Sequence, residues 1–211
     1  PMLSLLLAIA PGVTLENGIP PQINEIRVDQ SGSDSDEYFE LIGNAGASLD
    51  GLTYIVIGDG SGGSGVVESI SDLAGLTIPA DGIFLAGESS MSIAIPDAIL
   101  SLGFENSDNV THMLVAGFTG SSQQDLDTDD DGVFDVTPWT SIVDSVSLVE
   151  TPNSGEQYYS SNTVGPDGSS AVAHAHVCSG VWEVASYDFT DDTPGDANNC
   201  SSITDCNSNG I

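Results

Sequence analysis

Six carboxylates crowd the eleven residues from Asp125 to Asp135, which read DLDTDDDGVFD. Two unit charges 4 Å apart repel by about 4 kcal/mol at an effective dielectric constant near 20. Three of these aspartates alternate with other residues, a glycine follows, and a further aspartate comes four residues after the third. This is the order of the first nine positions of an EF-hand calcium loop, in which the alternation aims carboxylates at one point. The expected Ca²⁺ ligands are Asp127, Asp129, Asp131, the carbonyl of Val133, and Asp135.

The acidic run departs from an EF-hand at its twelfth position, where Pro138 replaces the usual glutamate. The flanking residues have the pattern of strands, so we expect a calcium loop between strands rather than between helices. Asp125 or Asp130 would join the ligands if the register shifted. The alternative is a solvated acidic loop that binds no ion.

A second, shorter copy of the spacing lies at the end of the chain, in DCNSNGI from Asp205 to Ile211. It predicts a weaker calcium loop with Asp205, Asn207 and Asn209 as ligands. Two other acidic turns, residues 29–37 and 188–192, lack this spacing. We expect their carboxylates to be solvated.

His174, His176 and Cys178 alternate along one expected strand, so their side chains share a face. They are ligand types for Zn²⁺ or copper. Cys178 is, however, the expected disulfide partner of Cys200, and the histidines are expected to be exposed or hydrogen-bonded. Cys206 is left over, and we expect its partner beyond Ile211. A disulfide favours an oxidising compartment, so the chain is predicted to be secreted, extracellular or at a cell surface.

The charge balance excludes several classes of function. The chain has one Lys or Arg, Arg27, against 32 Asp and Glu, for a formal net charge of −31. Nucleic acids and anionic membranes are bound through Lys and Arg, so neither is an expected partner. The sequence has no Gly-x-Ser-x-Gly nucleophile motif, and its glycine-rich turn at 58–65 has no phosphate-binding lysine. We therefore expect a protein that is not an enzyme.

The first ten residues are almost entirely apolar but too few to span a bilayer, which takes about 20 residues in a helix. Two interpretations remain open. The segment is a retained remnant of a secretion signal, or it docks on a neighbouring subunit and makes the chain a homo-oligomer or polymer. The expected assembly residues are Met2, Leu3, Leu5, Leu6, Leu7 and Ile9.

Short apolar runs rich in Val, Ile, Tyr and Phe recur between turns of Gly, Asp and Pro, and no helical period is sustained. The pattern predicts an all-β sandwich of about 8–10 strands with long loops. The run at 52–57 is nearly continuous, which favours burial on both faces. From about Asp191 the composition is that of a tail or linker. The expected strands are 23–28, 38–42, 52–57, 66–70, 83–86, 110–118, 142–149, 171–178 and 181–189.

Several motifs occur in an order that resembles the bacterial lamin tail domain. These are Ile23-Asn24-Glu25-Ile26, then Glu40-Leu41, then Leu49-Asp50-Gly51-Leu52, and finally Trp182 with Thr193-Pro194-Gly195-Asp196-Ala197-Asn198. The resemblance implies an immunoglobulin-like sandwich that serves as a binding or attachment module without catalytic residues. The acidic run is similar to an insertion of secreted bacterial members.

Three parts of the chain follow from these patterns: an apolar segment with linker at 1–21, a lamin-tail-like sandwich at 22–199, and a calcium-repeat-like tail at 200–211. The predicted function is a non-catalytic, extracellular, calcium-binding protein with a structural, attachment or self-assembly role, such as a surface or fibre subunit. The alternative is a targeting module of a larger secreted nuclease or phosphatase whose catalytic domain lies outside this chain.

Overall fold

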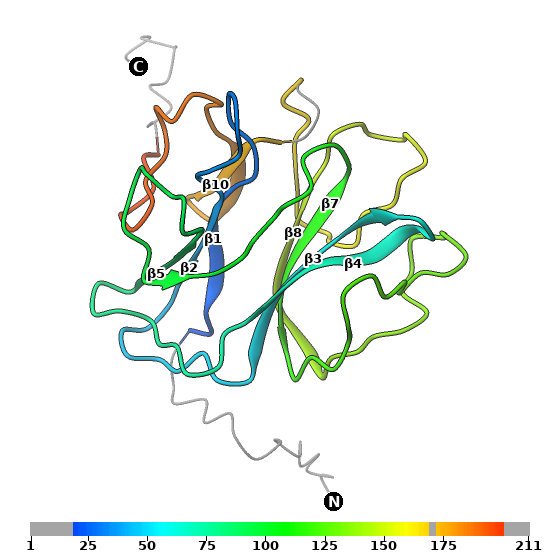
Figure 1. The fold of residues 1–211 in the computed structure, drawn as a ribbon, viewed down its shortest axis with the longest axis horizontal. Coiled ribbons are helices and arrows are strands. Elements are labelled where there is room, and N and C mark those ends of the chain that lie inside the picture. Colours follow the sequence, from blue (N-terminus) through cyan, green and yellow to red (C-terminus); the bar gives the residue numbers. More distant parts are fainter. Residues whose placement is uncertain (1–18, 169–171, 201–211) are drawn as a thin grey trace, which may run out of the picture.

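A computed structural model describes residues 19–168 and 172–200. That part of the chain is all β, with eleven strands and no helix (Figure 1), which confirms the predicted fold class. No helix within it is long and apolar enough to cross a membrane. The strands are β1 (Gln22–Arg27), β2 (Tyr38–Ile42), β3 (Leu52–Gly60), β4 (Gly63–Asp72), β5 (Ile83–Gly87), β6 (Ala98–Ile99), β7 (Val110–Ala116), β8 (Ser141–Leu148), β9 (Thr163–Val164), β10 (His174–Cys178) and β11 (Val181–Val184).

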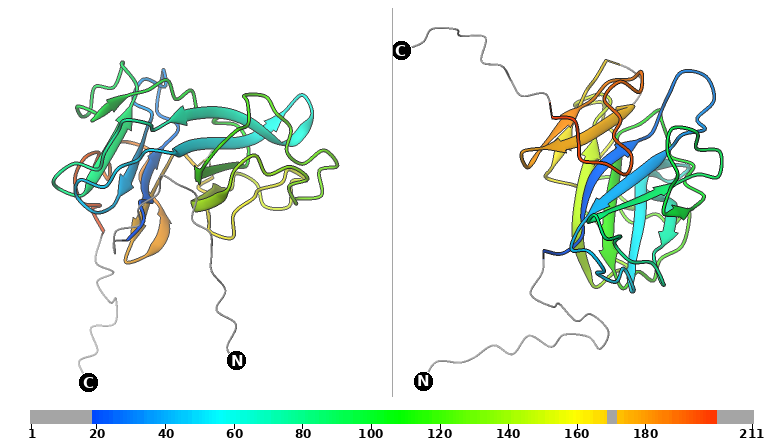
Figure 2. Two further views of the ribbon diagram at one scale, coloured as in Figure 1. Left: turned by 90° about the horizontal axis from the view of Figure 1, so that it is seen from below. Right: turned by 90° about the vertical axis from the view of Figure 1, so that its left-hand side faces the viewer.

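The strands form two sheets that face each other (Figure 2). One sheet has six strands in the order β11-β10-β1-β2-β5-β6, and the other has five in the order β4-β3-β7-β8-β9. Pairing is antiparallel except where the two-residue strands β6 and β9 join their neighbours. Each sheet is therefore built mainly from long antiparallel ladders, which leave alternate side chains on opposite faces.

The main core lies between the sheets. Phe39 of β2 stacks on Tyr54 of β3 with ring centroids 3.8 Å apart, and both rings are fully buried. Ile26 of β1 and Leu114 of β7 belong to the same cluster. Burying such apolar side chains contributes about 1.5–3 kcal/mol each and holds the two sheets together.

The outer face of the five-stranded sheet is covered by the loop at 118–140, which we call the insertion. Ile55, Ile57 and Met113 of the sheet form a second buried apolar cluster with Leu126 of the insertion. Because β3 thus has apolar neighbours on both faces, residues 52–57 are all buried, as the continuous run predicted.

The outer face of the six-stranded sheet is covered by residues 186–200, which we call the strap. The prediction of a linker from Asp191 is wrong, and so is a strand that runs to 189, since β11 ends at Val184. Polar side chains of β1 and β2 bind the strap, so a composition typical of a loop is held in place by hydrogen bonds. The predicted disulfide between Cys178 and Cys200 ties its end to β10, with Cα atoms 5.5 Å apart.

Candidate metal centre

The acidic loop, residues 125–135, is held by the hairpin of β3 and β4. The backbone N–H of Leu126 donates to the carbonyl of Gly65 at 2.9 Å, and Leu126 is fully buried in the apolar cluster of the insertion. One turn later, Asp130 Oδ1 accepts the N–H of Ser64 at 2.7 Å. The loop is therefore fixed at two points against the five-stranded sheet.

Glycines of the hairpin make room for this contact. Gly63 has a φ of +111°, and a Cβ placed there would lie 2.4 Å from Asp130 Oδ1. A side chain at this position would clash with the loop as well as strain the backbone. The glycine-rich turn, which has no phosphate-binding lysine, thus has a structural role as the surface on which the acidic loop rests.

Asp127 organises the loop from inside. Its carboxylate is fully buried, and Oδ1 accepts the N–H of Asp131 at 3.2 Å. Oδ2 accepts the N–H of Gly132 at 2.9 Å and the hydroxyl of Tyr159 at 2.8 Å. Gly132 has a φ of +85°, the conformation the turn predicted from the sequence requires. One carboxylate therefore closes the turn by three hydrogen bonds.

Three carboxylates meet at the mouth of this turn. Asp127, Asp129 and Asp135 each offer one oxygen, and these oxygens lie within 4.8 Å of one another. The pKa of Asp129 is raised, chiefly by the charge of Asp131 and also by Asp135 and Asp127. The pKa of Asp135 is lowered, because its Oδ2 accepts both the hydroxyl and the N–H of Thr128. A donor set made only of oxygen suits a hard cation such as Ca²⁺.

Asp131 is placed differently from what the EF-hand order predicts, and the predicted role of the Val133 carbonyl stays a prediction. Asp131 is not part of the group of three, and its Oδ1 accepts the N–H of Val133 at 2.9 Å. The side chain of Val133 is largely exposed. The second predicted loop, with Asp205, Asn207 and Asn209, lies outside the described residues, as do the assembly residues from Met2 to Ile9.

Tyr159 is a site residue that the sequence pattern missed. Its hydroxyl donates to Asp127, and its ring stacks on Phe134 with centroids 4.3 Å apart. Burial and the neighbouring Asp127 raise the pKa of the phenol, so it stays a donor. Trp139 packs edge-on against Phe134 and against the second apolar cluster.

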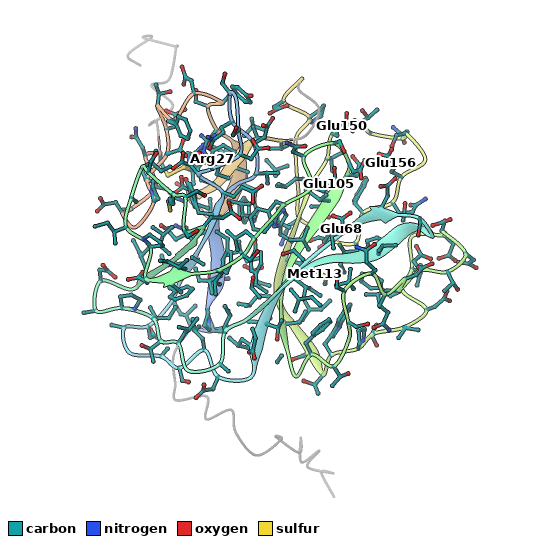
Figure 3. All side chains as sticks on the ribbon, viewed as in Figure 1. Arg27, Glu68, Glu105, Met113, Glu150 and Glu156 are labelled. Atoms are coloured by element: carbon teal, nitrogen blue, oxygen red, sulfur yellow. A yellow bond between two sulfur atoms is a disulfide. The ribbon has the colours of Figure 1, made fainter. Side chains whose placement is uncertain are left out.

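A second group of three carboxylates comes from β3 and from two loops, at Asp108 and Glu156. Oxygens of Asp59, Asp108 and Glu156 lie within 4.8 Å of one another. Burial, and then the charges of nearby acids including Glu105, raise the pKa of Glu68 to about 8. Glu68 Oε2 is buried and has no hydrogen-bond partner in the described part of the chain. Burial and the hydrogen bond with Asp59 raise the pKa of Asp108 to about 7. Figure 3 shows Glu68, Glu105 and Glu156 well apart from Arg27.

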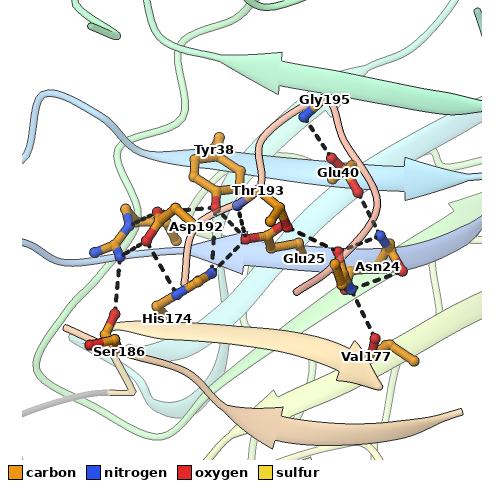
Figure 4. Close-up of polar contacts among 12 residues, drawn as sticks. Asn24, Glu25, Tyr38, Glu40, His174, Val177, Ser186, Asp192, Thr193 and Gly195 are labelled. Carbon is orange, nitrogen blue, oxygen red and sulfur yellow. Dashed lines mark hydrogen bonds and ion pairs between the residues drawn. The ribbon is translucent and has the colours of Figure 1, made fainter. Parts of the chain in front are cut away.

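Arg27 lies under the strap instead, where it contacts Asp192 in a buried polar network. Figure 4 labels Asp192, Glu25 and His174 of this network. The Arg27 guanidinium forms a two-pronged contact with Asp192 and donates to the carbonyl of Ser186. Next to it, Glu25 accepts the hydroxyl of Tyr38 at 2.7 Å, the hydroxyl of Thr193 at 2.7 Å and Nε2 of His174 at 2.7 Å. Although burial opposes ionisation of Glu25, its partners lower its pKa, led by His174. The network is thus compensated by groups of the protein itself.

The strap is held at a second place by side chains from the motifs of the family resemblance. Glu40 accepts the N–H of Gly195 at 2.9 Å, and burial raises the pKa of Glu40 to about 8. The amide of Asn24 donates to Asn198 at 2.9 Å, and that of Asn198 donates back to the Asn24 carbonyl at 3.1 Å. Asn24 and Glu40, from two motifs far apart in the sequence, therefore hold the strap, which contains the third motif.

Two of the acidic turns predicted to be solvated are partly buried. Asp36 accepts the N–H groups of Ser92 and Ile93, and Glu37 accepts the N–H of Phe104. Burial raises the pKa of Glu37 to about 7. In the other turn, the side chain of Asp192 is buried against Arg27. These carboxylates serve as caps for backbone donors and as partners for a guanidinium, roles that sequence spacing does not reveal.

Comparison of the chain with protein-family models, with curated proteins and with solved structures finds no match. The resemblance to the lamin tail domain therefore stays a prediction, and the function is argued from the site.

Proposed function

We propose that the protein is a calcium-stabilised, non-catalytic β-sandwich that acts outside the cell in attachment or assembly. The observation that carries the calcium proposal is the convergence of Asp127, Asp129 and Asp135 within 4.8 Å. Ca²⁺ takes six to eight oxygen ligands at about 2.3–2.6 Å, and carbonyls and waters would complete the shell.

The charge distribution supports an external cation at this loop. Arg27, the only Lys or Arg of the chain, is committed to Asp192 on the opposite outer face. The pKa of Asp129 is raised by its acidic neighbours, so the loop carries repulsion that is not compensated from within. A divalent cation would convert that repulsion into attraction.

Isothermal titration of the full chain tests the calcium proposal. Ca²⁺ is expected to bind with at least one saturable site, and Mg²⁺ more weakly, because it demands a tight octahedron and gives up its water reluctantly. Asp129→Asn is expected to weaken Ca²⁺ binding. Absence of saturable Ca²⁺ binding to the wild-type chain would refute the proposal.

The proposed extracellular role is supported by two indirect observations, the disulfide and the order of the motifs. The disulfide between Cys178 and Cys200 is compatible with an oxidising compartment. The order of the Asn-Glu-Ile, Glu-Leu and Thr-Pro-Gly motifs resembles an attachment module, and their polar side chains share one network with the strap. An attachment module needs a stable scaffold rather than a reactive cleft, which fits a sandwich braced on both outer faces.

Electron microscopy of the purified chain tests the assembly role. Self-assembly through residues 1–10 predicts oligomers or polymers, and deletion of residues 1–12 is expected to leave monomers. Polymers that persist after the deletion would refute assembly through this segment, and a full-length chain that stays monomeric would refute self-assembly. Neither result would bear on calcium binding, which is measured separately.

A further inference from the structure

Two neighbouring strands of the six-stranded sheet place two histidines and a glutamate beneath the strap. Glu25 of β1 lies directly opposite His176 of β10, and His174 is two residues away on the same face. Glu25 and His174 are fully buried, and His176 is 5% exposed. One ring nitrogen of each histidine and one oxygen of Glu25 lie within 4.8 Å of one another.

His176 is the member of this group that the hydrogen-bond network leaves out. Its Nδ1 is buried and has no hydrogen-bond partner among the described residues. Buried polar groups are nearly always paired, so an unpaired ring nitrogen beside a histidine and a carboxylate points to a missing ligand.

His174 has the surroundings of a metal-binding histidine. Its Nε2 lies 2.7 Å from Glu25 Oε1, and its Nδ1 lies 3.5 Å from Asp192 Oδ2. A carboxylate behind the ring usually orients a metal-binding histidine. Asp192 lies near enough for this role, although Nδ1 of His174 makes no hydrogen bond among the described residues. Among residues 19–168 and 172–200, Glu25 Oε2 accepts a hydrogen bond from the Thr193 hydroxyl alone, so it keeps a lone pair for a metal.

We propose that Glu25, His174 and His176 form a site for Zn²⁺ or a divalent cation of similar chemistry. Two imidazoles and one carboxylate are an established donor set for zinc, whereas the all-oxygen acidic loop suits calcium. Tetrahedral ligands at about 2.0–2.1 Å from zinc lie about 3.4 Å apart, so the three donors need only a modest approach.

An exposed carboxylate lies beside His176 on the edge strand of the sheet. Glu183 of β11 lies opposite His176, and its carboxylate is within 4.8 Å of a nitrogen of that ring. Glu183 is exposed, so this side gives the ion a route from solvent. Cys178, which also lies near His176, is closed to the metal by its disulfide with Cys200.

Cobalt titration of the full chain in saturating Ca²⁺ tests the site, because four-coordinate Co²⁺ absorbs visible light and reports zinc-like binding. One equivalent is expected to bind, and Zn²⁺ is expected to displace it. His176→Asn is expected to weaken binding at least about tenfold. The variant should fold normally, since His176 makes no side-chain hydrogen bond in the described structure. Asp129→Asn is the matched control and should leave the cobalt signal unchanged.

An unchanged cobalt affinity in His176→Asn would overturn the proposal, as would the absence of a four-coordinate spectrum. The wild-type chain offers a second measurement that needs no variant. On addition of Zn²⁺, nitrogen resonances of the His174 and His176 rings are expected to shift, while those of His112 stay in place. His112 is a sound internal control because it is fully buried against Tyr54 on the other sheet. Shifts at His112 alone, or at no histidine, would also overturn the site.

Discussion

The insertion and the strap cover the two outer faces of the same sandwich by opposite means. The insertion buries Leu126 and packs Phe134 against the five-stranded sheet, then exposes a loop of carboxylates. No described residue of the strap belongs to either apolar cluster, and the strap is held by Arg27, Glu25 and other buried polar groups. The insertion is therefore apolar on the side that faces its sheet and charged on the side that faces solvent. The strap is charged on the side that faces its sheet.

The difference lies in where each region finds its positive charge. Under the strap, Arg27 neutralises Asp192, and Glu25 is hydrogen-bonded to His174. The acidic loop has no such partner, and its carboxylates are arranged around a point that an ion would occupy. A chain with a single guanidinium can compensate only one of these regions from within.

Arg27→Met is expected to have the largest effect. The substitution leaves the carboxylate of Asp192 buried without its partner, and breaking a buried ion pair in this way costs about 3–5 kcal/mol. Chemical denaturation in the presence of Ca²⁺ measures the loss.

The double variant Arg27→Met with Asp192→Asn is the control for that measurement. It removes both charges and is expected to recover part of the stability, since an uncharged pair has a smaller desolvation cost. Equal stability of wild type and Arg27→Met would contradict the claim that the strap is neutralised from within.

Removal of Ca²⁺ is expected to have the next largest effect. A ligand at about 100 times its dissociation constant stabilises the native state by about 2.7 kcal/mol. EDTA should therefore lower the melting temperature and open residues 123–138 to protease, while the strap keeps its resistance. Unchanged melting and cleavage in EDTA would rule out a structural role for calcium.

Comparison of Asp129→Asn with Asp131→Asn tests whether the Ca²⁺ ligands are those of the observed cluster or those of the EF-hand spacing. Asp129 belongs to the group of three, whereas Asp131 accepts the N–H of Val133. We expect the first variant to weaken Ca²⁺ binding about tenfold, which corresponds to about 1.4 kcal/mol, and the second to weaken it less. A larger loss in Asp131→Asn would restore the EF-hand order as the better description.

Glu68→Gln is expected to stabilise the protein modestly at alkaline pH. The pKa of Glu68 is raised to about 8 from an ordinary value near 4.5, so between these values the folded state binds more protons than the unfolded state. The free energy of unfolding then falls as pH rises. Because Glu68 is partly exposed, we expect a gain of only about 1 kcal/mol near pH 8.5 in EDTA.

Glu37 is the matched control for this effect. Burial raises its pKa to about 7, but its carboxylate accepts the N–H of Phe104. Glu37→Gln should therefore gain less than Glu68→Gln. A gain for Glu68→Gln that is as large at pH 5 as at pH 8.5 would show that its origin is not titration.

Much of the fold was predictable because local patterns determine it. Alternating apolar residues identified most strands, and the continuous run at 52–57 indicated a strand covered on both faces. The strap was not predictable, because its stability comes from partners distant in the chain. Asn24 and Asn198 are 174 residues apart, and nothing in the local composition of either segment signals their contact.

The candidate site was predictable in part for the same reason. The spacing from Asp127 to Asp135 located the acidic loop, since its turn is closed by local hydrogen bonds. The spacing did not predict that Asp131 would bind Val133, nor that Tyr159 would donate to Asp127 from 32 residues away. Side-chain orientation within a turn depends on what the turn packs against.

Hydrogen exchange measured segment by segment, with Ca²⁺ and with EDTA, tests whether the acidic loop needs an added cation while the strap is neutralised by residues of the chain. Ca²⁺ is expected to slow exchange in residues 121–135 and in the β3–β4 hairpin on which they rest. Exchange in the strap is expected to stay the same, because its contacts with Arg27 and Glu25 need no calcium. No Ca²⁺-dependent protection of the acidic loop, or a calcium response centred on residues 186–200, would contradict a calcium site in that loop.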